Sequence, residues 1–324
     1  MGRERMKLDI TKEFLLEEER EGFIVPALMK RCWATKLQMI CDINEVCVRN
    51  GIRFYADYGT LLGAARHRGF VPWDDDIDIS MFRDDYNRAI PILRRELPET
   101  YEVFSFGNNL FSAPWTYINN RRGWDVGEGG EAARITAGFF GDPYCETIDL
   151  FPLDYVPADE AEREVFLEIH SLIFDVILQY NEGKELGIID DLADQIVELT
   201  GQPLPRGDAL LPALAAIEAA LAQVYTRDIS VGVDNIGNMA NHSRTKWRDL
   251  SWYERTVYLP FEMIEIPAPV GYREIIRTVF GSGWMIPVKN TATHEYPCYM
   301  RQEREILAYW EKKGAPRPDP LGIS

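Results

Sequence analysis

The stretch DYGTLLGAARHRGFVPWDDDIDISMF, residues 57–82, decides the fold, because a Gly-Thr pair at its start is followed by aspartates that alternate with isoleucines. Successive side chains of a β-strand point to opposite faces of a sheet. The alternation predicts a strand over residues 76–81 in which Asp76 and Asp78 share one face. Ile77 and Ile79 share the other face and are expected to enter the core.

The two aspartates on one face predict a metal site. Two residues along a strand span about 6.6 Å, so carboxylates at this spacing can converge on one divalent ion or bracket two ions about 3.5–4 Å apart. Oxygen ligands suit Mg²⁺ or Mn²⁺. Asp74 falls on the same face and is expected to support the ions, whereas Asp75 should point elsewhere. A run of acidic residues is usually a solvated surface, but the interleaved isoleucines indicate a half-buried strand.

Two more pieces extend this pattern. Asp149 lies between apolar residues in TIDLF, residues 147–151, which predicts a neighbouring strand that brings a third carboxylate to the metals. Gly59 and Thr60 stand at an expected strand-to-helix turn, where small residues let backbone N–H groups approach a phosphate. The order of Gly-Thr, paired aspartates and a lone aspartate is far more informative than any one piece.

The rest of the chain divides into segments by pattern. We expect a lead-in over 1–29, a catalytic core over 30–160, a helical insert over 161–225 and a C-terminal part over 226–324 that completes the cleft. The apolar stripe of the insert either packs beside the core or forms a dimer face. Further predictions are helices over 27–49, 84–97 and 299–312, a strand over 52–57, short strands within 101–106, 115–120 and 147–151, and a mobile loop over 123–131.

Composition narrows the class of protein. The 324 residues are 46% hydrophobic and carry a formal net charge of −17, which disfavours nucleic acid and anionic membranes as partners. No apolar run reaches the roughly 18 residues of a membrane span, and the charged N-terminus lacks a signal-peptide core. We therefore expect a cytoplasmic protein that touches the inner face of a membrane only transiently. The five cysteines are expected to be free thiols, without a zinc site.

The string at 57–86 closely resembles the signature of the LicD family of phosphotransferases, which includes fukutin and fukutin-related protein. The segments IDLFPLDYVP at 148–157 and FEMIEIPAPVGYREIIRTVFGSGWMIP at 261–287 extend the resemblance. The family's fold is the nucleotidyltransferase fold typified by DNA polymerase β. The resemblance thus implies an α+β protein, with a mixed sheet and flanking helices plus the helical insert.

The resemblance also implies a reaction. Family members move a phospho-alcohol such as phosphocholine from a CDP-alcohol, here with CDP-choline as the expected donor, to a hydroxyl of a cell-surface glycan, teichoic acid or lipopolysaccharide precursor. Asp76, Asp78 and Asp149 would hold Mg²⁺ or Mn²⁺ against the diphosphate, with Asp149 alternatively acting as base toward the acceptor. The residues expected to bind substrate are Gly59, Thr60, Arg66, His67, Trp73 and His294.

Two other functions fit the same residues. The protein could attach a nucleotidyl group from an NTP to a protein or small alcohol, or it could be an inactive scaffold whose acidic cluster binds cations. Single residues also have plainer roles open to them. Trp73 and Tyr58 could seal a loop instead of packing a base, Arg66 and His67 could form a surface pair, and His294 could be structural.

Overall fold

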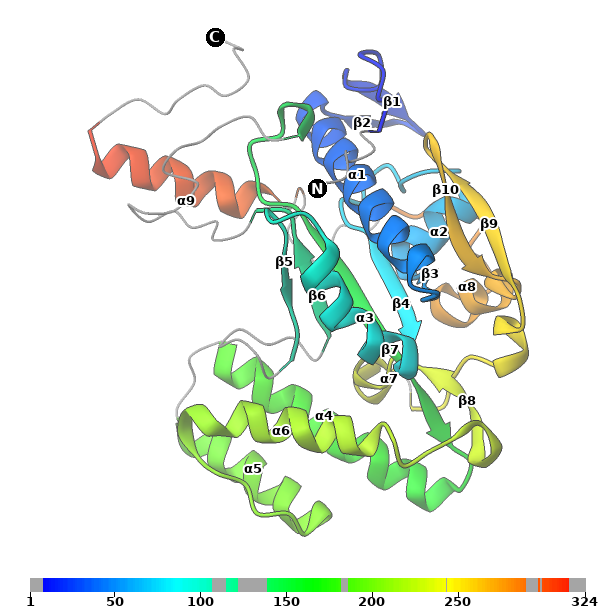
Figure 1. Ribbon diagram of the computed structural model, residues 1–324, viewed down its shortest axis with the longest axis vertical. Coiled ribbons are helices and arrows are strands. Elements are labelled where there is room, and N and C mark those ends of the chain that lie inside the picture. The colour runs from blue at the N-terminus through cyan, green and yellow to red at the C-terminus, as the bar shows by residue number, and fades with distance from the viewer. Residues whose placement is uncertain are drawn as a thin grey trace.

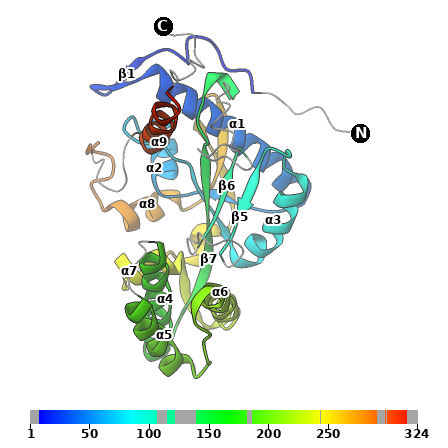
Figure 2. The same cartoon turned by 90° about the vertical axis from the view of Figure 1, so that its left-hand side faces the viewer.

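A mixed sheet with helices on both faces forms the centre of the protein (Figures 1 and 2). The computed structural model describes residues 8–106, 115–121, 139–181, 186–242, 244–289, 297 and 299–314. Helices α1 and α3 cover one face of the sheet, and α2 and α8 lie on the other (Figure 2). The expected α+β architecture, with a mixed sheet and flanking helices, is confirmed. The predicted loop over 123–131 and His294 lie outside the described residues.

The elements follow one another along the chain with strands and helices intermixed. The strands are β1 (Glu18–Arg20), β2 (Phe23–Val25), β3 (Tyr55–Ala56), β4 (Asp78–Phe82), β5 (Glu102–Phe104), β6 (Thr116–Asn119), β7 (Thr147–Pro157), β8 (Ser230–Asp234), β9 (Thr256–Phe261) and β10 (Ile264–Pro269). The helices are α1 (Ala27–Arg49), α2 (Tyr58–Arg66), α3 (Arg83–Glu96), α4 (Glu160–Asn181), α5 (Leu186–Thr200), α6 (Leu210–Leu221), α7 (Ile236–His242), α8 (Tyr272–Phe280) and α9 (Tyr299–Lys312).

The central sheet has the order β3-β4-β7-β6-β5 within the described residues. Strand β4 runs parallel to the first part of β7, while the other pairs along this path are antiparallel. The second part of β7 pairs with β8 instead. Residues 158–229 leave the sheet at the end of β7 and return at the start of β8, where the Ala158 N–H donates to the Ile229 carbonyl at 3.0 Å.

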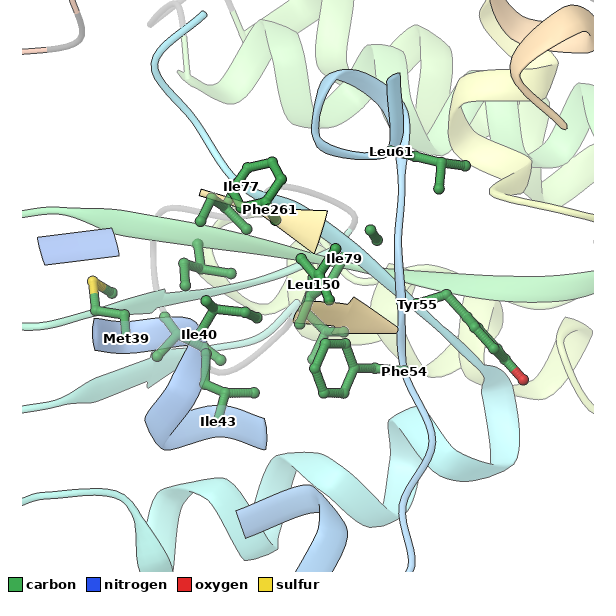
Figure 3. Close-up of a cluster of buried hydrophobic side chains, with 14 of the residues drawn as sticks. Met39, Ile40, Ile43, Phe54, Tyr55, Leu61, Ile77, Ile79, Leu150 and Phe261 are labelled. Carbon is green, nitrogen blue, oxygen red and sulfur yellow. The ribbon is translucent and has the colours of Figure 1, made fainter. Parts of the chain in front are cut away.

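Helix α1 supplies much of the core beneath the sheet. It starts after Pro26, whose fixed φ suits the position before a helix, and it ends at Asn50 before Gly51, which takes a left-handed φ of 61°. Figure 3 shows Met39, Ile40 and Ile43 of this helix among side chains from the sheet. Ile77 and Ile79 are completely buried there, as the alternation of residues 76–79 predicts.

Strand β4 starts later than the sequence indicates. Its first residue is Asp78, not Asp76, and the predicted strand over 52–57 is reduced to β3. The Asp78 N–H donates to the Thr60 hydroxyl at 2.8 Å. The segment from Asp74 to Asp76 therefore enters the sheet as an irregular chain.

Helices α4, α5 and α6 gather at the end of β7, at the bottom of Figure 1. They share their own hydrophobic cluster, in which Val176, Ile196 and Leu214 are completely buried. Burying an apolar side chain of this size stabilises the fold by about 1.5–3 kcal/mol. The apolar stripe of the insert is thus used for packing within the chain.

Buried ionisable groups join these helices to the sheet. Nε and Nη2 of Arg83, at the start of α3, donate to the two carboxylate oxygens of Asp154 on β7 at 2.7 and 2.6 Å. Glu218 of α6 and His170 of α4 are buried close to this pair. Burial raises the pKa of Glu218 to about 8 and lowers the pKa of His170 to about 4.

Two expectations drawn from composition can be compared with the described residues. Cys32, Cys41, Cys47 and Cys145 are free thiols, while Cys298 lies outside the described part. In the described ranges, no helix combines the length and apolar character that crossing a bilayer requires.

Candidate active site

A pocket of about 620 Å³ opens where β4 and β7 begin, between the N-terminal half of α2 and the end of α8. Its polar lining comes mainly from four aspartates of β4, β7 and the segment before β4. The remainder is aromatic, aliphatic and glycine. The described lining residues are Tyr58, Gly59, Leu62, Arg66, Val71, Trp73, Asp74, Asp76, Asp78, Trp115, Asp149, Phe151, Val279, Phe280, Gly283, Trp284, Ile286 and Val288.

Asp78 and Asp149 stand side by side in the sheet. They are partners in the parallel register of β4 and β7, where neighbouring strands lie about 4.8 Å apart. The Asp149 N–H donates to the Ile77 carbonyl at 3.1 Å, which fixes this register at the mouth of the pocket. Both carboxylates line the cavity, and Asp76 joins them from the segment just before β4.

Gly59 is required by the position of Asp74. A Cβ atom at Gly59 would collide with the Asp74 carboxylate, so that carboxylate lies directly against the first turn of α2. The Asp74 N–H donates to the Val71 carbonyl at 2.9 Å, and Trp33 Nε1 donates to the Asp74 carbonyl at 3.1 Å. These bonds hold the loop that presents Asp74 to the pocket.

The aspartates before β4 form a tighter cluster than the strand pattern predicts. One carboxylate oxygen each from Asp74, Asp75 and Asp76 lies within 4.8 Å of the others. Asp75 does not line the pocket and is completely buried, yet it lies beside the two aspartates that do. Asp75 thus stays out of the pocket lining, as expected, but it lies closer to Asp74 and Asp76 than strand alternation predicts, because the chain has not yet entered the strand at this position.

The carboxylates raise one another's pKa. Burial, and then the charges of Asp76, Asp149, Asp74 and Asp57, raise the pKa of Asp78 well above its usual range. Loss of water and the neighbouring Asp76 do the same to the pKa of Asp74. Concentrated negative charge of this kind favours a bound cation or a bound proton.

The entry into α2 is held by a buried ion pair that sequence reasoning missed. Asp57 precedes the helix and accepts the Tyr58 N–H at 2.8 Å, while its second oxygen accepts from Arg248 Nη1 at 2.6 Å. Arg248 is 1% exposed, and its Nε lies 3.2 Å from Asp234. No local pattern marks Arg248, which reaches Asp57 across 191 residues of sequence.

Tyr58 adopts a strained backbone at this entry. Its φ is 38°, in the left-handed region that favours glycine, at a cost of about 1–3 kcal/mol. The Arg248 guanidinium lies 5.4 Å from the centre of the Tyr58 ring, and the ring lines the pocket. Such strain is commonly found where a side chain must be aimed into a functional site.

Arg66 lies in the pocket with its guanidinium held by protein atoms. Nη1 donates to the Trp284 carbonyl at 2.6 Å, and Nε donates to His67 Nε2 at 2.8 Å. His67 Nδ1 in turn lies 3.2 Å from Glu21. Burial and the charge of Arg66 lower the pKa of His67, which favours the neutral imidazole that accepts the hydrogen bond from Arg66.

An aromatic wall stands beside Asp149. Phe151 follows Asp149 on the same strand face, and its ring meets Tyr58 edge-on at 5.2 Å. Trp115 lies just before β6, opposite Phe151, with ring centres 5.1 Å apart. Trp73 lines the pocket nearer to Asp74.

The residues predicted to bind substrate therefore separate into two groups. Gly59, Arg66 and Trp73 line the pocket with the three predicted catalytic aspartates. Thr60 and His67 do not line it. Thr60 is 2% exposed and accepts the Asp78 N–H, and His67 accepts from Arg66, so both contact a pocket residue without lining the pocket themselves.

Part of the chain matches a known protein family. Residues 51–115 match the protein family described as LicD/FKTN/FKRP, nucleotidyltransferase domain. This range includes Asp76 and Asp78 and ends at Trp115.

Three individual relatives match over shorter parts of their length. The lipopolysaccharide cholinephosphotransferase LicD of Haemophilus influenzae is 39% identical over 80 residues, 23% of this chain and 30% of that protein. The ribitol 5-phosphate transferase FKRP of Mus musculus is 46% identical over 65 residues, 20% of this chain and 13% of that protein. An uncharacterized protein of Rickettsia prowazekii is 44% identical over 48 residues, 15% of this chain and 18% of that protein. Each match thus spans less than a third of the relative.

Proposed function

We propose that this chain transfers a phospho-alcohol from a CDP-alcohol to a hydroxyl of a glycan, because residues 51–115 match the LicD/FKTN/FKRP nucleotidyltransferase domain family. The observation that carries the proposal is the pairing of Asp78 with Asp149 across β4 and β7, at the base of a pocket that Asp76 and Arg66 also line. The central sheet with its flanking helices would then be a nucleotidyltransferase fold of the DNA polymerase β type.

The donor atoms of the pocket fit a hard divalent cation. Asp76, Asp78 and Asp149, with Asp74 beside them, offer only carboxylate oxygens, the ligands that Mg²⁺ and Mn²⁺ prefer. Burial and then the charges of the neighbouring aspartates raise the pKa of Asp78, as expected where several carboxylates meet in a pocket. When bound, the cation would neutralise charge on the diphosphate of the donor.

The side chains around the carboxylates have separate tasks in this reaction. Arg66, oriented by His67 and the Trp284 carbonyl, would bind a phosphate oxygen of the donor. Asp149 lies on the side of the aromatic wall and would accept the proton of the acceptor hydroxyl as the new P–O bond forms and the P–O bond to the departing CMP breaks. Thr60 would keep Asp78 in register without contacting substrate.

The pocket lining favours choline as the alcohol. Trp115, Phe151 and Tyr58 present aromatic surface next to Asp149, and a quaternary ammonium group is attracted both to aromatic faces and to a nearby carboxylate. Among the described lining residues, the hydroxyl groups of ribitol or glycerol would have to compete with the cation and the diphosphate for the four aspartates and Arg66. CDP-choline is therefore the donor we propose.

The test is release of CMP by the purified full chain. With Mg²⁺ and a phosphorylated glycan acceptor, CDP-choline should give acceptor-stimulated CMP, and CDP-ribitol and CDP-glycerol should give less. Trp115→Ala should lower the ratio of CMP release from CDP-choline to that from CDP-ribitol, because the aromatic contact to the quaternary ammonium group of choline is lost. Full activity in Asp78→Asn, or no CMP with any of the three donors, would rule the proposal out. Pyrophosphate release from CTP or ATP would instead support nucleotidyl transfer from an NTP.

A further inference from the structure

A second cavity, of about 410 Å³, lies on the other side of α8 from the candidate active site. It is lined by Thr245, Lys246, Trp247, Arg277 and Thr278. Two of these five side chains are cationic, and no carboxylate belongs to this lining among the described residues. The chain as a whole carries a net charge of −17, so a cavity whose charged side chains are all cationic differs from the rest of the protein.

Lys246 is available to bind an anion. It is exposed and has no acidic partner within 4.0 Å among the described residues. The nearby Arg244 differs, because its guanidinium contacts Glu168 at 2.7 Å and Glu164 at 3.7 Å. The charge of Lys246 is therefore not used by the fold.

Arg277 is only weakly engaged. It lies 3.5 Å from Glu274, one helical turn earlier, and the two side chains are 57% and 45% exposed. An ion pair this exposed contributes about 0–1 kcal/mol. A phosphate group, which can accept two parallel N–H bonds from a guanidinium, would compete for Arg277 successfully.

The other walls suit a sugar better than a bare ion. The Thr278 hydroxyl donates to the Glu274 carbonyl at 2.9 Å, so its oxygen can only accept a hydrogen bond from a ligand. An ionised phosphate oxygen cannot donate that bond, whereas a sugar hydroxyl can. Trp247 closes the cavity, and the Arg163 guanidinium lies 5.1 Å from its ring centre, which adds positive charge nearby.

Helix α8 contributes side chains to both cavities. Arg277 and Thr278 line the cationic cavity, while Val279 and Phe280, the next two residues, line the active-site pocket. Residues two apart on a helix point about 200° from each other, so the cavities lie on opposite sides of a helix roughly 10 Å across. One extended oligosaccharide can reach both by passing the end of α8.

We infer that the cavity of Lys246 and Arg277 binds a phosphate group carried by the glycan acceptor, one helix width from the reacting hydroxyl. This inference rests on the proposed function, in which an acceptor hydroxyl must approach a pocket lined by four aspartates. An anionic glycan is repelled by those carboxylates. A cationic cavity nearby supplies the attraction that holds it in place.

A direct binding measurement tests the cavity without any reaction. Titration of the full chain with glucose 1-phosphate, glucose and inorganic phosphate, followed by NMR, should show the tightest binding for glucose 1-phosphate. Lys246→Gln and Arg277→Gln should each weaken it about tenfold, the size of a lost charge-assisted hydrogen bond. Arg273→Gln, an exposed arginine on the same helix, is the matched control and should bind as the parent chain does. Equal affinity for glucose 1-phosphate and inorganic phosphate, or an equal loss in the control, would overturn the inference.

Kinetics separate this inference from the proposed function. With a phosphorylated glycan acceptor, Lys246→Gln and Arg277→Gln should raise the acceptor KM about tenfold and leave kcat and CDP-choline binding unchanged. Phosphatase treatment of the acceptor removes both contacts at once and should raise the KM of the parent chain by more than either substitution does. An unchanged KM would refute the acceptor site. Absence of CMP release with every donor would refute the proposed function, while the titration would still decide whether the cavity binds sugar phosphates.

Discussion

The hydroxyl of Thr60 accepts the main-chain N–H of Asp78 at 2.8 Å, which ties the first residue of β4 to the first turn of α2. Both residues are buried. The position of the Asp78 carboxylate therefore depends on a side chain that does not line the pocket.

Replacing Thr60 tests this dependence. Thr60→Val keeps the shape but leaves the Asp78 N–H without a partner, which should cost about 1–3 kcal/mol of stability and most of the proposed transferase activity. Thr60→Ser retains the hydroxyl and should keep most of the activity. Thermal unfolding and CMP release measure the two effects. If Thr60→Val were as active as Thr60→Ser, the bond would have no role in placing Asp78.

The two glycines of the pocket should respond differently to alanine. Gly59→Ala forces the Asp74 carboxylate away from α2, because the new Cβ would occupy its place. The expected result is a loss of activity of about 100-fold, as for other small displacements in active sites. Gly283→Ala is the matched control, since nothing lies within 4 Å of its Cβ position. Similar activities of the two variants would show that Asp74 is free to move.

Removing the charge of Asp78 should stabilise the chain and inactivate it. The charges around Asp78 repel it in the absence of a cation, so Asp78→Asn should raise the melting temperature in EDTA. Mg²⁺ should raise the melting temperature of the parent chain by mass action and that of the variant much less. Asp228→Asn, an exposed aspartate far along the chain, controls for the change in net charge. A variant with lower stability in EDTA would contradict this account.

Glu218 predicts a pH dependence of stability. Burial raises its pKa to about 8 in the folded state from a usual value of 4.5, so the folded chain holds this proton more tightly. Stability from this group is fully present below pH 4.5 and is lost as the pH rises through 8. Glu218→Gln cannot ionise, and its unfolding free energy at pH 9 should exceed that of the parent chain by a few kcal/mol. Urea unfolding at pH 5 and pH 9 measures this difference, which should nearly vanish at pH 5.

Arg248 should stabilise the fold mainly by neutralising the buried carboxylates of Asp57 and Asp234. Arg248→Met leaves Asp57 and Asp234 without their cation and should cost about 3–5 kcal/mol. Adding Asp57→Asn removes one of the stranded charges and should recover part of the loss. A double variant no more stable than Arg248→Met would show that the pair is not coupled.

Local patterns in the sequence are sufficient to predict which side chains of a strand face the core and where a helix ends. The alternation at 76–79 correctly predicts that Ile77 and Ile79 face the core, and Gly51 correctly ends α1 near Arg49. These signals act between residues a few positions apart, where the geometry of a strand or a helix fixes which side chains share a face.

The remaining features of the fold and the site depend on contacts between residues far apart in the sequence, and no local pattern predicts these contacts. The start of β4 at Asp78 depends on Thr60, and the helix entry depends on Arg248, which lies 191 residues from Asp57. The meeting of Trp115 with Phe151 requires the register of β6 against β7. Such pairs follow from tertiary packing, which composition and periodicity do not encode.

The excursion of residues 158–229 starts and ends at one point, where Ala158 and Ile229 are hydrogen-bonded at 3.0 Å. Its length therefore has no bearing on the distance between β4 and the first half of β7. Insertion or removal of residues within this excursion would leave the register of Asp78 against Asp149 unchanged, because both of its ends are fixed at the same point of the sheet.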